Sequence, residues 1–579
     1  MLNRSTLYLT TSFVLISSGQ LSANANFSTA PTNPDFLLYQ QQAAFGIVQS
    51  VLPDSQGYAR GLSPAPFQYP QINTQNDLPF TLVQATTYPA KYDLRLMGKL
   101  NPVRNQGSCG NCWTYGAVGS IESSLKQAES QDFSESHIND THGFDVAWCQ
   151  GGNDLMSMAY LTRWSGVGKN SDYPQPITST TTKITAQKHI QNIDVLPKRS
   201  TPLDNNAIKQ AVMTSGAVTI TYMSDSDNYN ATTFAWYNPV NTKVDHEVVI
   251  VGWDDSYPKT RFKTQPAGNG AFIVRNSWGT SFGEKGYFYL SYYDKTIIPG
   301  AAFHNSEPVS NYAFLYNYDP LGVTGFTGYG SDTAWLANTF TAGTKTGSNL
   351  IRAAGIYSPV PNTNYEIRVY KNTNQTPQMP TSGTEITQAR TTGTIKQAGY
   401  HTIKLAKTAT VTAGKKFSIV VKLQTPNYNY PIAYERPFAN YSSQATAKAG
   451  QSYISYNGSS WDDLTQYANN TNIALKAYAG GSDKIPNSFN FMDKVSVAKN
   501  TYLSSNSIKV TGINGSAPIS IKSGEYKINS GSFTSAAGTV PNNATVIVRH
   551  KTSNTGNSNT HTILNIGGMT DTFSTRTKP

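Results

Sequence analysis

The stretch QGSCGNCW, residues 106–113, places two cysteines three positions apart, with a tryptophan directly after the second. The chain has one further cysteine, Cys149, which opens the sequence CQGG. A C-x-x-C pair occurs in redox dithiols and in zinc sites, whereas a single free cysteine can be a catalytic nucleophile. The roles of these three cysteines therefore decide the chemistry and the fold of this region.

Zinc is disfavoured because three cysteines need a fourth ligand and no histidine has suitable spacing. A redox dithiol formed by Cys109 and Cys112 is a weaker alternative, since thioredoxin-like sites usually carry the tryptophan before the pair. We keep it as a thiol oxidoreductase hypothesis. We expect no metal and no other cofactor.

The first residues indicate export. Arg4 leads into the apolar run LYLTTSFVLISS and the small-residue site Ala23-Asn24-Ala25, which predicts a signal peptide over 1–25. No later apolar stretch is long enough for a membrane helix, so the protein is expected to be secreted and not membrane-spanning. An exported chain with three cysteines is expected to carry one disulfide and one free thiol.

The charge pattern gives little sign of a nucleic-acid partner. The net charge is +11, but only 14% of the 579 residues are charged, and no lysine or arginine run is dense enough for a nucleic-acid groove. The last 99 residues carry ten Lys/Arg against four Asp/Glu. Weak, salt-sensitive attraction of this region to an anionic cell surface is therefore a hypothesis.

The length favours three or four domains, and composition divides the chain after the signal peptide into four segments. Short β-branched runs separated by Gly, Pro and Asn are typical of β-sandwiches, whereas mixed helix and strand patterns indicate an α+β domain. The expected fold class is multidomain α+β followed by two all-β sandwiches. The segments are a leader rich in Pro, Gln, Asn and Thr at 26–88, a mixed region at 89–302, and all-β regions at 303–480 and 485–579.

Cys112 has the context of a nucleophile. A thiol with a pKa near 8.5 is only about 3% ionised at pH 7, so it needs activation. The pattern CWTYGAVGSIESSL predicts a helix that begins at Cys112, and a helix N-terminus stabilises a thiolate. His246, at the start of the strand-like run EVVIVGW, is the best-placed basic partner. Asn276 follows the run FIVR and can accept a hydrogen bond from the imidazole, while Trp278 shields that bond from water.

The motifs QGSCGNCW, DHEVVIVGWDD and NSWGTSFGEKGY, in this order, resemble the papain/cathepsin family of cysteine peptidases. The spacing of Cys112, His246 and Asn276 also matches this family. The resemblance implies a two-lobed papain-like domain over 89–302, with Cys112 as nucleophile, His246 as acid/base and Asn276 as the orienting residue. It further implies an oxyanion hole formed by Gln106 and the Cys112 N–H, in which one donor is typically worth roughly 3–4 kcal/mol.

The same resemblance implies a disulfide between Cys109 and Cys149, which leaves Cys112 free. The closed loop of about 40 residues is worth about 4 kcal/mol on the chain-entropy account. Gly151 and Gly152 are then expected to line the substrate groove, where their backbone pairs with an extended polypeptide substrate.

Departures from the family pattern concern the surroundings of these residues. Asn111 replaces a small residue, Glu247 replaces a small apolar residue after the histidine and is expected to affect the pH optimum, and Phe282 replaces a tryptophan. The leader has no clear counterpart of the long helical prosegment of cathepsins. We nevertheless predict that the full-length zymogen is latent and becomes active on cleavage near residues 85–92.

The two all-β regions resemble modules of bacterial secreted proteins. Residues 303–480 resemble a lectin-like domain, which implies glycan binding, and residues 485–579 resemble an Ig-like spacer or adhesion module. Trp335 and Trp461 are aromatic residues suited to stacking on a sugar, but in a sandwich we expect them to be core residues.

Two main functions follow. The first is a secreted cysteine endopeptidase with β-domains for targeting or adhesion. The second is a carbohydrate-binding adhesin whose peptidase module is incidental or inactive. The complete set of Gln106, Cys112, His246 and Asn276 favours the enzyme, because an adhesin has no need of a free thiol at a helix end.

Overall fold

The structure is a computed structural model of the 579-residue chain. The expected signal peptide lies outside the residues it describes, as does part of the expected cleavage region. Among the described residues, no helix is long and apolar enough to cross a membrane. The structure describes residues 27–45, 57–70, 88–126, 128–174, 184–240, 242–373, 379–481, 484–513 and 515–579.

The first lobe of the region after the leader is helical. Its central helix is almost entirely buried, because Trp113, Ala117 and Ile121 pack into the lobe while Gly116 and Gly119 let strand β7 approach closely. The side chain of Asn153 caps the helix that follows the Gly151–Gly152 pair. The helices are α2 (Cys112–Leu125), α3 (Glu135–Thr141) and α4 (Asp154–Thr162).

The second lobe is a sheet of the order β10-β4-β7-β8-β9-β6-β5, with β2 also paired to β7. Every residue of β7 is buried, as its run of apolar residues predicts, and α5 (Asn206–Ser215) packs against the sheet. The strands are β2 (Lys91–Asp93), β4 (Val218–Tyr222), β5 (Tyr229–Asn230), β6 (Ala235–Trp236), β7 (His246–Asp254), β8 (Ala271–Arg275), β9 (Tyr287–Ser291) and β10 (Ile298–Pro299).

A third sheet joins the two-lobed region to the first all-β region. Its order is β11-β3-β19-β15-β25-β12, so that β3 pairs with β11 on one side and with β19 on the other. The expected limit between residues 302 and 303 falls inside β11, and the domain limits stay predictions. The strands are β3 (Lys188–Val195), β11 (Ala301–Pro308), β12 (Phe314–Tyr316), β15 (Leu350–Ser358), β19 (Ala398–Thr410) and β25 (Leu475–Ala479).

Two more sheets complete the first all-β region. Trp461 is buried in a small cluster with Tyr453 and Val420, whereas Trp335 is partly buried beneath the guanidinium of Arg368. One sheet contains β14 (Thr333–Thr341), β16 (Thr363–Lys371), β17 (Thr384–Glu385), β18 (Thr391–Ile395), β20 (Lys416–Gln424), β22 (Ser452–Ser455) and β23 (Asp462–Asp463); the other contains β1 (Ser28–Thr29), β13 (Gly325–Gly328), β21 (Ile432–Glu435) and β24 (Asn472–Ile473).

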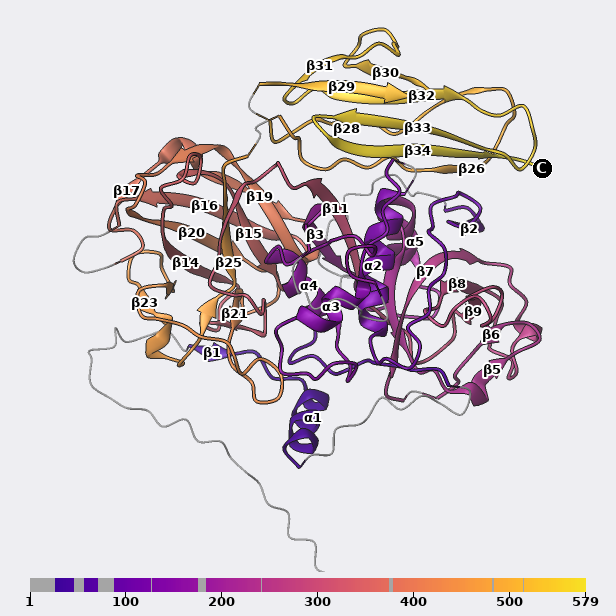
Figure 1. Ribbon diagram of the computed structural model, residues 1–579, viewed down its shortest axis with the longest axis horizontal. Helices are drawn as coiled ribbons and strands as arrows, with labels where there is room; N and C mark the ends of the chain where they lie inside the picture. The colour runs from indigo at the N-terminus through magenta and orange to yellow at the C-terminus, as the bar shows by residue number, and fades with distance from the viewer. Residues whose placement is uncertain are drawn as a thin grey trace, which may run out of the picture.

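The C-terminal region forms a separate layer across the top of the molecule in Figure 1. Two sheets enclose an apolar core, and the Tyr92 hydroxyl donates to Asp493 across the contact with the two-lobed region. One sheet contains β26 (Lys494–Val497), β29 (Ser516–Lys522), β31 (Gly538–Pro541), β33 (Asn559–Ile566) and β34 (Met569–Thr577); the other contains β27 (Tyr502–Ser504), β28 (Ile508–Lys509), β30 (Glu525–Ile528) and β32 (Thr545–Lys551).

The leader contacts both the first all-β region and the two-lobed region. β1 adds to the edge of β13, and helix α1 (Pro34–Ala44) lies at the bottom of the view in Figure 1, where Phe36 packs against Tyr441. Residues 57–70 then pass between the two lobes, beside Gly152 and Asp245.

Candidate active site

Cys112 lies at the first position of α2, and its sulfur is buried and not in a disulfide. Cys109 and Cys149 are bonded to each other, which confirms the expected disulfide and excludes a dithiol exchange between Cys109 and Cys112 in this state. The backbone N–H of Glu247 donates to the Cys112 sulfur over 3.4 Å. The sulfur therefore lies next to the strand residue that follows His246.

Burial raises the pKa of the Cys112 thiol well above its ordinary value. The nearby carboxyl groups of Glu247 and Asp245 raise it further, whereas the N–H groups of Glu247 and Trp113 act in the opposite direction. Burial beneath the leader thus opposes ionisation of this thiol, against the effect of its position at a helix N-terminus.

His246 and Asn276 form a hydrogen-bonded pair at the ends of two neighbouring strands. The imidazole Nε2 donates to Asn276 Oδ1 over 2.8 Å, and the same oxygen accepts from the N–H of Ser277 over 2.8 Å, which fixes the amide. The Trp278 ring stacks on the imidazole with a centroid distance of 4.6 Å. The His246 side chain is fully buried, so water has no access to this pair.

Gln106 is fully buried, and its amide is fixed on both sides. The oxygen accepts from the Ser277 hydroxyl, and Nε2 donates to Cys109 O over 2.8 Å. Nε2 also donates to the carbonyl oxygen of leader residue Arg60 over 3.1 Å. A carbonyl oxygen thus already occupies the position that an oxyanion hole offers.

The Gly151–Gly152 pair contacts the leader through its backbone. Gly152 N–H donates to Gly61 O over 3.0 Å, and Ser63 N–H donates to Gly152 O over 2.8 Å. A Cβ atom on Gly152 would overlap the Trp113 ring, which explains the glycine. The groove is therefore suited to an extended backbone, and in this structure the leader fills it.

The opposite end of the groove is formed by Trp278. Its indole N–H donates to Ala59 O over 2.8 Å, and the Tyr58 ring stacks on the indole with a centroid distance of 4.6 Å. Together with the Gly152 contacts, these bonds lay leader residues 58–63 across Cys112 and His246.

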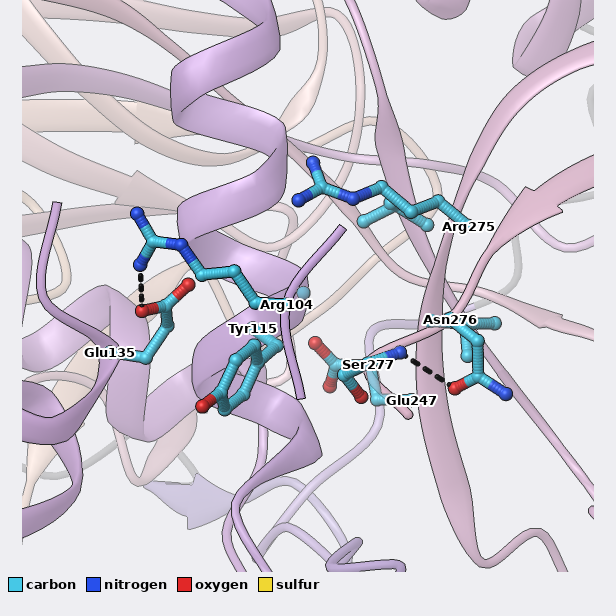
Figure 2. Close-up of a pocket in the computed structure, with 10 residues that line it drawn as sticks. Arg104, Tyr115, Glu135, Glu247, Arg275, Asn276 and Ser277 are labelled. Carbon is cyan, nitrogen blue, oxygen red and sulfur yellow. Dashed lines mark hydrogen bonds and ion pairs between the residues drawn. The ribbon is translucent and has the colours of Figure 1, made fainter. Parts of the chain in front are cut away.

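Sequence reasoning missed an acidic pair behind this site. Glu247 is buried beside the carboxyl group of Asp154, and Figure 2 shows it near Ser277 and Tyr115 in a small cavity. Burial and the neighbouring Asp154 raise the pKa of Glu247 well above its ordinary value, and burial raises that of Asp154 to about 6. An aspartate at the first position of a helix reads as an ordinary N-terminal residue, so no sequence signal distinguished Asp154.

Comparison with known families agrees with this geometry. Residues 88–301 match the papain family cysteine protease model, and residues 315–479 match the lectin like domain model. Residues 88–301 belong to the papain family. The expected fold class, a papain-like domain followed by a large all-β region, is thereby confirmed, whereas the Ig-like character of the last region stays a prediction.

Curated relatives match the papain-family domain. Cysteine protease Amb a 11.0101 of Ambrosia artemisiifolia is 28% identical over 42% of this chain, and cysteine proteinase 2 of Entamoeba histolytica is 31% identical over 34% of it. This chain spans only 60% and 62% of the lengths of these two relatives.

Among solved structures, the cysteine protease and lectin-like domains of Cwp84, a surface layer associated protein of Clostridium difficile, align over 79% of this chain and 99% of that one. The identity is 24% and the TM-score 0.64. A cysteine-to-alanine variant of the clostridial cysteine protease Cwp84 after propeptide cleavage aligns over 68% of this chain and 99% of that one, at 25% identity and a TM-score of 0.58. The papain-family and lectin-like domains therefore share their arrangement with a known fold.

Proposed function

We propose that this protein is a secreted cysteine endopeptidase that hydrolyses peptide bonds of a polypeptide substrate. The observation that carries the proposal is the buried His246–Asn276 pair beside the unbridged sulfur of Cys112. A nucleophile, a base and a group that orients the base are the minimum set for acyl transfer through a covalent intermediate.

The reaction follows from these positions. His246 takes the proton of Cys112, and the sulfur attacks the substrate carbonyl carbon while Gln106 Nε2 and the Cys112 N–H bind the developing oxyanion. His246 then protonates the leaving amine as the C–N bond breaks. Water, deprotonated by His246, attacks the thioester carbonyl, and the sulfur leaves as thiolate and recovers its proton from His246.

We further propose that the full-length form is a latent zymogen that cleavage near residues 85–92 activates. The position of the leader supports this. The carbonyl oxygen of Arg60 accepts a hydrogen bond from the Gln106 amide, and the backbone of residues 61–63 pairs with Gly152. Burial of the sulfur beneath the leader also opposes ionisation of Cys112. Equal activity of cleaved and uncleaved protein would contradict this.

A thiol-directed epoxide tests the central proposal. We expect the mature protein to take up the label at one site, and a Cys112→Ala variant to remain unlabelled, because Cys109 and Cys149 are bonded to each other. Peptide hydrolysis is measured in parallel. Equal labelling of the two proteins would contradict the assignment of the nucleophile.

The two β-domains are proposed to direct the enzyme to its substrate, through glycans or an anionic cell surface. The signal sequence and the resemblance to modules of bacterial secreted proteins support export. The charge pattern supports a protein without nucleic-acid partners. An adhesin with an inactive peptidase module remains the competing hypothesis, and the epoxide experiment distinguishes the two.

A further inference from the structure

The side chain of leader residue Arg60 occupies a binding site for a cation in the second lobe. Its Nε donates to Ser224 Oγ over 2.8 Å and lies 3.0 Å from Asp245 Oδ2. Its Nη2 donates to Ser224 O over 2.9 Å. A carboxylate, a hydroxyl and a carbonyl oxygen thus converge on one guanidinium.

The groups that bind this guanidinium, on Ser224 and Asp245, are held in place by hydrogen bonds within the second lobe. The N–H of Ser224 donates to Asp245 Oδ1 over 2.8 Å, and the N–H of Asp245 donates to Tyr222 O over 3.2 Å. These bonds do not involve the leader. The acceptors therefore keep their positions when the leader is removed.

The backbone of the same leader residue lies over the reacting groups. Arg60 O accepts a hydrogen bond from Gln106 Nε2. The N–H groups of Gly61 and Leu62 donate to Asp245 O over 3.4 and 3.3 Å. A substrate whose scissile carbonyl binds Gln106 places its backbone along the same path. The side chain next to its scissile bond then reaches Asp245 and Ser224.

Removal of the leader leaves this carboxylate without its cation. The Asp245 side chain is only 24% exposed while Arg60 covers it, so pairing with a charged group there is screened less than at an open surface. A substrate cation that takes the place of Arg60 restores the pair, whereas a neutral side chain leaves the carboxylate unpaired.

We propose that Asp245 and Ser224 form a subsite for a basic side chain, arginine above lysine, in one of the two residues that flank the scissile bond. Arginine is favoured because Arg60 uses two nitrogens of its planar group against two acceptors of Ser224 as well as the carboxylate. This inference rests on the proposed peptidase function and names its substrate class.

Matched peptides test the subsite on the mature protein. Peptide pairs carry arginine or its neutral isostere citrulline at each position flanking the scissile bond, and kcat/KM is measured for each. We expect arginine to be preferred about 10-fold or more at one of these positions, and Asp245→Asn to reduce that ratio to about 2 or less. The exposed Asp227→Asn, three residues after Ser224, is the control and should retain the full ratio.

A second measurement needs no enzyme variant. A synthetic peptide of leader residues 57–70 is tested as an inhibitor of the mature protein, with Arg60 present or replaced by citrulline. We expect the citrulline peptide to inhibit about 10-fold more weakly. Equal inhibition by the two peptides, or an arginine-to-citrulline ratio near 1 in the unaltered protein, would overturn the subsite.

Failure of the subsite is distinguishable from failure of the proposed function. If the mature protein takes up the epoxide at Cys112 and cleaves arginine and citrulline peptides equally, only the subsite is wrong. If it neither takes up the label nor cleaves any peptide, the peptidase proposal itself is wrong.

Discussion

The papain-family domain and the lectin-like domain each bury a cluster of ionisable groups, and the first cluster borders the groove that the leader fills. In the papain-family domain, Cys112 and His246 lie under residues 58–63 of the leader, and Glu247 beside them contacts the carboxyl group of Asp154. Removal of a single segment would expose this site.

In the lectin-like domain, Lys476 and Asp319 are fully buried and form an ion pair with each other. Glu435, beside them, accepts from the N–H of Leu321, and burial together with the Asp319 charge raises its pKa to about 8. The cation of this cluster already has its counter-ion. Buried charge alone therefore does not indicate a functional site; its position beside a substrate path does.

The largest expected effect comes from the first cluster. Cys112→Ala should lower kcat/KM for peptide hydrolysis by about 10⁴-fold or more, because no other group supplies the covalent intermediate. The free energy of unfolding should change by less than about 1 kcal/mol, since alanine is smaller by one sulfur atom only. Peptide assays and denaturant titration of the mature protein measure the two quantities. Residual activity within 10-fold of the unaltered protein would contradict the role of Cys112 as nucleophile.

Substitution in the lectin-like cluster should lower stability but leave the reactivity of Cys112 unchanged. Lys476→Met leaves the Asp319 carboxylate buried without its cation, so we expect a loss of about 3–5 kcal/mol in unfolding free energy. The folded protein should still take up the epoxide at Cys112. Urea titration monitors the lectin-like domain, and the exposed Lys415→Met serves as control. A stable variant without peptidase activity would show that this cluster does serve the reaction.

A smaller effect is expected at the oxyanion site. Gln106→Ala removes one amide donor, which should lower kcat by about 10²–10³-fold and change KM little. The exposed Gln210→Ala on α5 is the matched control. A change in KM alone would indicate that Gln106 binds the ground state of the substrate rather than the oxyanion.

The smallest effect concerns pH and Glu247. At pH values where Glu247 is ionised, its charge opposes ionisation of the Cys112 thiol, so Glu247→Gln should move the midpoint of epoxide labelling downward in pH. The unaltered protein should also lose stability as pH rises above about 4.5, because the folded state keeps a proton on Glu247 that the unfolded state releases. The glutamine variant should lose less over the same range. An unchanged labelling profile would contradict the role of this carboxyl; the exposed Asp227→Asn is the control.

Local sequence was sufficient to predict the helix and strand that carry Cys112 and His246, because their formation depends on neighbouring residues in the chain. The helix that begins at Cys112 and the strand that begins at His246 follow from residue type and periodicity. The pairing of Cys109 with Cys149 came with the family resemblance and is confirmed. The catalytic roles of Gln106, Cys112, His246 and Asn276 stay predictions.

The sheet that joins β3 to β19, the path of the leader and the meeting of Glu247 with Asp154 had no such signal. Each depends on contacts between residues tens to hundreds of positions apart, which neither propensity nor short spacing encodes.

The sequence by itself thus determined which chemical groups are present, which helix and strand ends carry them, and to which family the two-lobed region belongs. Only the tertiary structure decided that Arg60 of the leader meets Asp245 and that its carbonyl reaches Gln106. The physical reason is that residue types and local periodicity specify elements, whereas packing of whole lobes sets the few ångströms between groups on which binding and catalysis depend.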